Sequence, residues 1–314
     1  MASVISRFVI EFFRLALNFN PEKNKNIVKA TKRLNAIGIF LLPHGFTLQN
    51  RKVGGVPIEI LKKKGSRPKN LVFAIHGGGF IAGISNMYRN AALQYHKACK
   101  GTAAVVNIDY RTVPNAKYPD AHEDILKVWD DLTGEGGFAP ENTVVVGDSA
   151  GGNLALSLML RLRDSGRALP KSAVLMSPWC DMTVRSASYR SNYKLDPIFG
   201  NKKGAITEAN LAKLLASDIY AYCGGHDRRD PYLSPLFADL TGLPPTLITV
   251  GSHEVLLDEI LAVGAKIKEG GADVTLEVGD GMFHCYPLLY PIMPEAKKAF
   301  DIIKKHLKSM MNDE

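Results

Sequence analysis

Gly147-Asp148-Ser149-Ala150-Gly151-Gly152 follows the β-branched run Thr143–Val146 and precedes the apolar stretch Asn153–Leu162. This order predicts a strand, a sharp turn and a helix, the arrangement of a nucleophile elbow, in which G-x-S-x-G presents a serine hydroxyl at the end of a parallel sheet. The glycines lack side chains, so strand and helix can approach closely around a strained serine. A glycine-rich connection without chemistry is one alternative. A phosphate loop is another, but the spacing fits neither G-x-G-x-x-G nor G-x-x-x-x-G-K-[ST].

A second glycine motif, His76-Gly77-Gly78-Gly79-Phe80, follows another apolar run, Leu71–Ile75. Three residues without side chains at a strand end can point their N–H groups at one spot. Ester hydrolysis needs such donors because the carbonyl oxygen becomes an oxyanion, and each donor is worth on the order of 10²–10³ in rate. In hydrolases with this serine motif, an HGGG loop and the amide after the nucleophile, here Ala150, supply them. We expect His76 to brace the loop rather than to act as a base.

A serine nucleophile also needs a general base, and in this arrangement the chain order is serine, acid, histidine. His306 lies among lysines in the amphipathic stretch Ala296–Met310 and is expected to be solvated. His284 follows the alternating strand Val274–Val278, which places it on a loop at a strand end. We therefore predict that His284 is the base, from the four histidines that follow the serine: His226, His253, His284 and His306.

The acid is expected after the apolar strand Thr246–Val250. Either Asp or Glu can orient the imidazole and stabilise the imidazolium. Glu254 lies just past this strand, before the next helical stretch begins. Asp258 lies one helical turn further on, where the helix dipole favours a carboxylate for structural reasons alone. Glu254 is the leading candidate and Asp258 the second, with Glu259 and Asp280 behind them.

Several motifs together resemble the hormone-sensitive-lipase-like branch of the α/β hydrolases. The resemblance implies an α/β-hydrolase fold with a helical cap. It also implies a serine carboxylesterase without cofactor or metal, which cleaves small-molecule esters of short to medium acyl chain through an acyl-enzyme. It covers about Leu71 to Pro287 and rests on HGGGF, GDSAGG, Asp109-Tyr110-Arg111-Thr112-Val113-Pro114, Tyr118-Pro119, Ser177-Pro178-Trp179 and Asp230-Pro231-Tyr232-Leu233-Ser234-Pro235-Leu236.

The resemblance also assigns roles by position. Ser149 matches the nucleophile and His284 the base. The oxyanion donors match Gly78, Gly79 and Ala150, with Gly77 as an adjacent candidate. Many members carry Asp-Pro-Leu-Arg-Asp at the acid, whereas this chain has Glu254-Val255-Leu256-Leu257-Asp258. Matching the second aspartate to Asp258 places the acid at Glu254.

Strands alternate with helical stretches along the chain, which predicts a mainly parallel sheet covered by helices on both faces. A length of 314 residues alone suggests about two domains. The motifs nevertheless span nearly the whole chain, so we expect a single α/β-hydrolase domain over residues 1–314. The resemblance places a cap at about residues 1–45 and about 182–222. Candidate acyl-pocket residues in that cap are Phe12, Phe13, Phe19, Met182, Tyr189 and Leu195.

The net charge of +8 is unevenly distributed, because residues 1–70 contain 14 Lys and Arg against 3 Asp and Glu. A solvated surface is the favoured explanation. Attraction of anionic substrates and peripheral contact of the basic N-terminal cap with an acidic membrane face are the alternatives. No motif indicates nucleic-acid binding. The four cysteines are far apart and lack C-x-x-C, so neither a disulfide framework nor a zinc site is expected.

The N-terminal stretch is amphipathic, with charges inside its apolar run and no small-residue cleavage site. We therefore expect neither a signal peptide nor an integral membrane segment, and a cytoplasmic location. An amidase or a thioesterase would use the same residues, and a catalytically silent small-molecule receptor would share the fold. A homodimer through an edge strand or the basic cap is also open.

Overall fold

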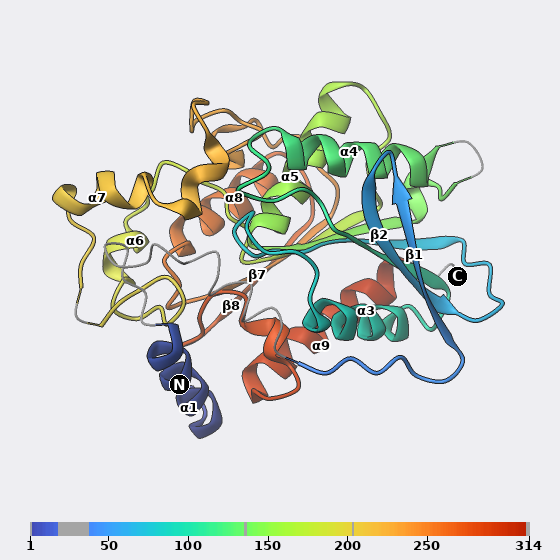
Figure 1. The fold of residues 1–314 in the computed structure, drawn as a ribbon, viewed down its shortest axis with the longest axis horizontal. Helices are drawn as coiled ribbons and strands as arrows, with labels where there is room; N and C mark the ends of the chain where they lie inside the picture. Colours follow the sequence, from blue (N-terminus) through green and yellow to red (C-terminus); the bar gives the residue numbers. More distant parts are fainter. Residues whose placement is uncertain (1, 18–37, 135–136, 203, 312–314) are drawn as a thin grey trace.

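A computed structural model describes residues 2–17, 38–134, 137–202 and 204–311. Within these ranges an eight-stranded sheet in the order β1-β2-β4-β3-β5-β6-β7-β8 runs through the molecule, with helices on both faces (Figure 1). The expected α/β fold with a mainly parallel sheet is confirmed. The strands are β1 (Phe46–Val53), β2 (Val56–Lys63), β3 (Asn70–Ile75), β4 (Ala103–Ile108), β5 (Thr143–Asp148), β6 (Ser172–Met176), β7 (Thr246–Gly251) and β8 (Val274–Gly279).

The helices fall into two sets. Those that cover the sheet are α3 (Asn86–Ala98), α4 (Asp120–Thr133), α5 (Ala150–Asp164), α8 (Leu257–Glu269) and α9 (Pro294–Met311). Those away from the sheet are α1 (Val4–Leu17), α6 (Ser188–Ser191) and α7 (Glu208–Leu215). Short 3₁₀ turns add η1 (Pro140–Asn142), η2 (Asp218–Cys223), η3 (Pro235–Phe237) and η4 (Tyr286–Leu289).

Strand pairing brings the candidate site residues to one edge of the sheet. β1 and β2 form an antiparallel hairpin, and β2 pairs antiparallel with β4. All the other pairs, from β4 through β3 to β8, are parallel. Carboxyl ends of parallel strands lie on the same edge, where ligands bind in open α/β sheets. The segments that follow β3, β5, β6, β7 and β8 therefore converge there.

The central strands β3 to β7 are apolar on both sides because helices cover both faces. One core lies between the sheet and helices α4, α5 and α8, and includes Phe73 packed edge-on against Trp129 at 5.5 Å between ring centroids. The second core lies under α3 and α9 and includes Phe300. In Figure 1 these two helix layers lie above and below the sheet. The central strands are thus a rigid, buried support for the loops at the sheet edge.

Helices α6 and α7 lie together at one side of the molecule, and α1 lies near them (Figure 1). Polar contacts join α1 to the segment between β6 and β7. Arg14 Nη2 donates to the carbonyl of Leu195 at 2.9 Å, and Lys202 Nζ lies 2.8 Å from Glu11 Oε1. Residues 18–37 of the expected cap, including Phe19, lie outside the described residues. No described helix is long and apolar enough to cross a membrane.

The environment of His306 differs from the sequence expectation. This residue is half-buried rather than solvated, and its Nε2 contacts the hydroxyl of Ser172 on β6. Burial lowers the pKa of His306 below its usual range. The lysines around it in the sequence occupy other faces of α9, which has a strongly one-sided apolar stripe.

Candidate active site

Ser149 lies between the last residue of β5 and the first residue of α5, in the turn predicted from the sequence. Its backbone has φ 50° and ψ −118°, a region that residues with side chains rarely adopt. Two hydrogen bonds hold this conformation: the amide of Ser149 donates to Met176 O at 2.9 Å, and its carbonyl accepts from Trp179 N at 3.0 Å. The end of β6 therefore holds the strained serine from both sides.

Two glycines of the motif are required by close packing. A Cβ on Gly147 would overlap the carbonyl of Gly151, and a Cβ on Gly151 would overlap the carbonyls of Ile75 and His76. These contacts join the start of α5 to the ends of β5 and β3. The steric role inferred for the glycines from the sequence matches this geometry.

The glycine loop after β3 divides into one engaged amide and two available ones. Gly77 N donates to Asp148 Oδ1 at 2.9 Å and lies 3.0 Å from Tyr88 Oη. Gly78 and Gly79 have positive φ values of 99° and 63°. Within the described ranges, no acceptor is bonded to the amides of Gly78, Gly79 or Ala150. Gly77 thus holds the loop in place, and the other three amides can serve a ligand.

Asp148 connects the serine turn to this loop. Its Oδ2 accepts from Tyr88 Oη at 3.0 Å, opposite the bond to Gly77. Burial raises the pKa of Asp148 to about 6, although the hydrogen bonds from Tyr88 and Gly77 and the charge of His284 oppose the rise. The Sγ of Cys285, the residue after the expected base, lies 3.8 Å from Asp148 Oδ2, which brings the loop of His284 next to the residue before Ser149.

His76 has the surroundings of a structural residue. Its Nδ1 lies 2.8 Å from the carbonyl of Gly77, and its ring stacks on Tyr110 at 4.2 Å between centroids. Tyr110 Oη also donates to the carbonyl of His76 at 2.8 Å. Burial lowers the pKa of His76, which keeps the ring neutral at physiological pH. These contacts favour the expected role of bracing the loop.

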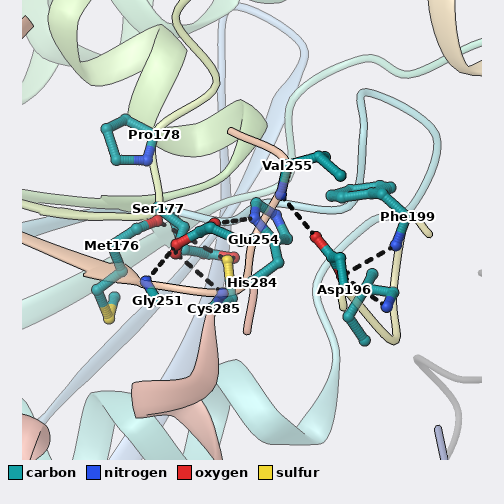
Figure 2. Close-up of polar contacts among 12 residues, drawn as sticks. Met176, Ser177, Pro178, Asp196, Phe199, Gly251, Glu254, Val255, His284 and Cys285 are labelled. Atoms are coloured by element: carbon teal, nitrogen blue, oxygen red, sulfur yellow. Dashed lines mark hydrogen bonds and ion pairs between the residues drawn. The ribbon is translucent and has the colours of Figure 1, made fainter. Parts of the chain in front are cut away.

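The predicted acid and base meet at the ends of the adjacent strands β7 and β8. His284 Nδ1 lies 2.9 Å from Glu254 Oε2, and the Glu254 side chain has no solvent exposure (Figure 2). The second carboxylate oxygen, Oε1, accepts from Ser177 Oγ at 3.0 Å and from the amide of Gly251. A carboxylate held by several donors is fixed in orientation and can fix the imidazole in turn.

The other carboxylates are occupied elsewhere. Asp258 Oδ2 accepts from the amide of Ser188 at 2.7 Å. Glu259 Oε1 accepts from the amides of Cys180 and Asp181 at 2.7 and 3.0 Å, and burial raises the pKa of Glu259 well above its usual range. The geometry therefore favours Glu254 as the partner of His284.

Ser177 has a part in the site that sequence reasoning missed. Its hydroxyl donates to Glu254 and accepts from the amide of Cys285 at 3.0 Å, so it links the acid to the loop of the base (Figure 2). Ser177 also has a positive φ of 47°. The sequence signal for this role is Ser177-Pro178-Trp179 directly after β6, a motif that by itself indicates only the family resemblance.

A pocket lies next to these residues and is lined mostly by the segment between β6 and β7. Of the candidate acyl-pocket residues, Tyr189 is in its lining. Phe12 and Leu195 are instead exposed, Met182 is buried, and Phe13 packs against Phe283. The ring of Phe199, one of the lining residues, lies 4.7 Å from that of His284, so the expected base lies next to the pocket wall. The lining residues are Trp179, Tyr189, Phe199, Ile206, Leu214, Tyr220, Val255 and Leu256.

Cys285 follows His284 but has the surroundings of an unreactive thiol. Burial raises the pKa of this thiol well above its usual range, with the Asp148 charge as a further cause. A thiol is nucleophilic as the thiolate, which this environment disfavours. Within the described ranges, no group of three or more His, Cys, Asp or Glu residues is arranged to hold a metal ion.

Comparisons with known proteins identify the family of this chain. Residues 72–288 match the model of a family with the α/β-hydrolase fold. An esterase of Acinetobacter venetianus is 35% identical over 272 residues, which cover 86% of this chain and 85% of that protein. An acetyl-hydrolase of Streptomyces hygroscopicus is 34% identical over 235 residues, covering 75% and 74% of the two chains.

Solved structures point to the same group. The crystal structure of an esterase from the bacterial hormone-sensitive lipase family matches with a TM-score of 0.82 and 30% identity, over 99% of this chain and 100% of that one. The α/β-hydrolase core, the strained serine and the buried acid–base pair are thus found in a chain that belongs to the α/β-hydrolase family, in its hormone-sensitive-lipase-like branch.

Proposed function

We propose that this protein is a serine carboxylesterase that cleaves small-molecule esters of short to medium acyl chain. The observation that carries the proposal is the buried hydrogen bond between His284 and Glu254, at the same edge of the sheet as the strained turn of Ser149. The available amides of Gly78, Gly79 and Ala150 supply what this constellation still needs, a site for an oxyanion.

The proposed reaction has two halves. Ser149 Oγ attacks the ester carbonyl while His284 takes its proton, and Glu254 holds the Nδ1–H and stabilises the imidazolium. The amides of Gly78, Gly79 and Ala150 donate to the oxyanion. The tetrahedral intermediate collapses, the alcohol leaves with the proton from His284, and an acyl-enzyme remains. Water then attacks the acyl group with His284 again as base, which releases the acid and restores the serine.

The pocket supports the substrate class. All eight lining side chains are apolar or aromatic, which suits a hydrocarbon chain and offers no charged partner for an anionic substrate. The proposed range of short to medium acyl chains is the one that the family resemblance implies. The similar protein of Streptomyces hygroscopicus, which is named an acetyl-hydrolase, supports the short end of this range.

The proposal is tested by hydrolysis of p-nitrophenyl acetate, butyrate, octanoate and palmitate. Wild type should act best on the short or middle chains, and Ser149→Ala should lower the rate by roughly 10⁶. Ser157→Ala is the matched control, because Ser157 is a buried serine of α5, the helix that begins directly after Ser149. Turnover that survives in Ser149→Ala would refute the nucleophile. Folded wild type that cleaves no ester would shift the assignment to an amidase, a thioesterase or a silent receptor.

We also propose a single domain over residues 1–314 with a cap at about 1–45 and about 182–222, and a cytoplasmic location. The contacts of Arg14 with Leu195 and of Glu11 with Lys202 support one cap built from both segments. Free cysteines, as at all four positions here, are typical of a reducing compartment. Subcellular fractionation of the native source tests the location.

We also propose two contacts of the protein surface, one with a membrane and one with a second copy of this chain. The face of α1 exposes large apolar side chains, with Phe8 75% and Leu15 83% exposed, which supports peripheral membrane contact through the cap. The basic hairpin of β1 and β2 lies on the other side of the molecule (Figure 1), so it would not share that surface. The outer edge of β8, which exposes Leu276 and Val278, supports a homodimer. Vesicle co-sedimentation and sedimentation velocity, respectively, test these two contacts.

A further inference from the structure

The segment Ser188–Phe199, which we call the clamp segment, holds the peptide groups around Glu254. Ser188 Oγ donates to the carbonyl of Val255 at 2.7 Å. Asn192 Nδ2 donates to the carbonyls of Ser252 and Glu254 at 3.0 and 2.9 Å. The expected acid therefore lies on a loop whose backbone is bound by side chains of the segment between β6 and β7, rather than by the sheet alone.

Asp196 makes the most constrained contact in the clamp segment. It is 2% exposed, and its Oδ2 accepts from Val255 N at 3.0 Å. Its Oδ1 accepts from the amides of Ile198 and Phe199 at 2.7 and 3.2 Å. Burying a carboxylate is costly unless donors surround it, and here the donors are three backbone amides. The carboxylate thus fixes these amides relative to one another.

The two oxygens of the Asp196 carboxylate bind backbone amides that lie next to the two members of the expected acid–base pair. On one side, Val255 follows Glu254 directly in the chain. On the other, the ring of Phe199 lies against the ring of His284, at 4.7 Å and an angle of 60° (Figure 2). Among the described residues Asp196 forms no hydrogen bond with His284, but the charge of His284 opposes the rise in the pKa of Asp196 that burial causes. A shift of this carboxylate would therefore move both the loop of Glu254 and the ring that backs His284.

We propose that Asp196 is a positioning residue for the Glu254–His284 pair, holding Val255 and Phe199 on one carboxylate. The inference rests on the proposed function, because Glu254 and His284 are taken as the acid and the base. A merely structural carboxylate would stabilise the fold without affecting the reaction. A positioning carboxylate sets the geometry of the base, so its loss lowers kcat more than it raises KM.

The test is Asp196→Asn in the full chain. The amide keeps the volume of the carboxylate, but its NH₂ group cannot accept a hydrogen bond. The variant therefore loses either the bond from Val255 N or the bonds from Ile198 N and Phe199 N. We expect kcat for p-nitrophenyl butyrate to fall about 10- to 100-fold, as for small misplacements of catalytic groups, with KM changed less than about threefold. The downfield proton NMR resonance of the His284 Nδ1–H should shift or broaden in parallel.

The matched control is Asp124→Asn. Asp124 is a buried carboxylate that also accepts from a backbone amide, that of Arg111 at 2.9 Å, but it lies on α4 away from the clamp segment. This variant should keep both kcat and the resonance. If Asp196→Asn does not fold, Asp196→Ser, which leaves room for a bridging water, is measured in the same way.

The outcomes separate the two proposals. Asp196 variants with unchanged kcat and an unchanged resonance, whatever their melting temperature, would overturn the positioning role while leaving the esterase proposal intact. If wild type shows no Ser149-dependent turnover, the esterase proposal fails. The resonance of His284 in Asp196→Asn against Asp124→Asn then still decides whether Asp196 positions the pair.

Discussion

Replacing Glu254 by Gln is the sharpest test of the proposed acid, because the change is nearly isosteric and its effect follows from the three bonds of the carboxylate. Gln can keep one oxygen for Ser177 Oγ and the amide of Gly251. Its NH₂ group then faces His284 Nδ1, where Glu254 Oε2 now lies at 2.9 Å. The NH₂ group can only donate, so Nδ1 must become the acceptor.

This reversal moves the ring proton of His284 to Nε2, the nitrogen that must accept the proton of Ser149. In serine triads an amide at the acid position lowers kcat by about 10⁴ for this reason. At about 1.36 kcal/mol per tenfold, the loss corresponds to about 5.5 kcal/mol of transition-state stabilisation. KM should stay nearly unchanged, because Glu254 is fully buried behind His284 and does not line the pocket.

The assay is steady-state hydrolysis of p-nitrophenyl butyrate at pH 8, with folding checked by circular dichroism. Asp258→Asn is the comparison, since Asp258 was the second candidate and its carboxylate accepts from Ser188 N instead of touching His284. We expect Asp258→Asn to stay within about tenfold of wild type, a loss far below that of a triad acid. A Glu254→Gln variant within tenfold of wild type, together with an inactive Asp258→Asn, would refute the assignment.

Three further predictions follow from the same geometry. Burial raises the pKa of Asp148 to about 6, so the wild type loses free energy of unfolding as this carboxyl ionises. The free energy of unfolding of Asp148→Asn relative to wild type should therefore increase by up to about 1.4 kcal/mol per pH unit as the pH rises from 5 to 6. Thermal melts across pH 5–8 measure this, and a constant difference would contradict it. Gly151→Ala should lower the melting temperature strongly or prevent folding, because its Cβ would overlap two carbonyls, whereas Gly225→Ala, whose Cβ meets nothing within 4 Å, should not. Leu214→Trp should fill part of the pocket and raise KM for p-nitrophenyl octanoate but not acetate; an equal change for both esters would place the acyl chain elsewhere.

Sequence patterns predicted the sheet and the strand-end residues because their causes are local. A β-branched run followed by a glycine-flanked serine permits few backbone paths, and β5 and α5 follow the predicted one. His284 could be singled out since it follows a strand in the required chain order. The choice between Glu254 and Asp258 was harder, as both follow β7 and Asp258 lies only about one helical turn beyond Glu254. It depends on side-chain direction, which the structure supplies through the bond to His284.

The pocket and the clamp segment were less predictable for a different reason. Ile206, Leu214 and Tyr220 come from a long connection with little regular structure, where apolar spacing does not reveal which side chains face inward. Asp196 is one of several aspartates in this connection, and in the sequence it resembles an ordinary turn residue. Its importance comes from contacts with Val255, 59 residues away in the chain, which no local pattern encodes.

The double use of the connection between β6 and β7 bears on protein engineering. Its distal part, with Ile206, Leu214 and Tyr220, lines the pocket, whereas its proximal part binds the loop of Glu254. Grafting the whole connection from a relative with another substrate range would exchange the support of the acid along with the wall. Chimaeras should therefore be joined after Phe199, so that selectivity is transplanted while the catalytic loop keeps its native brace.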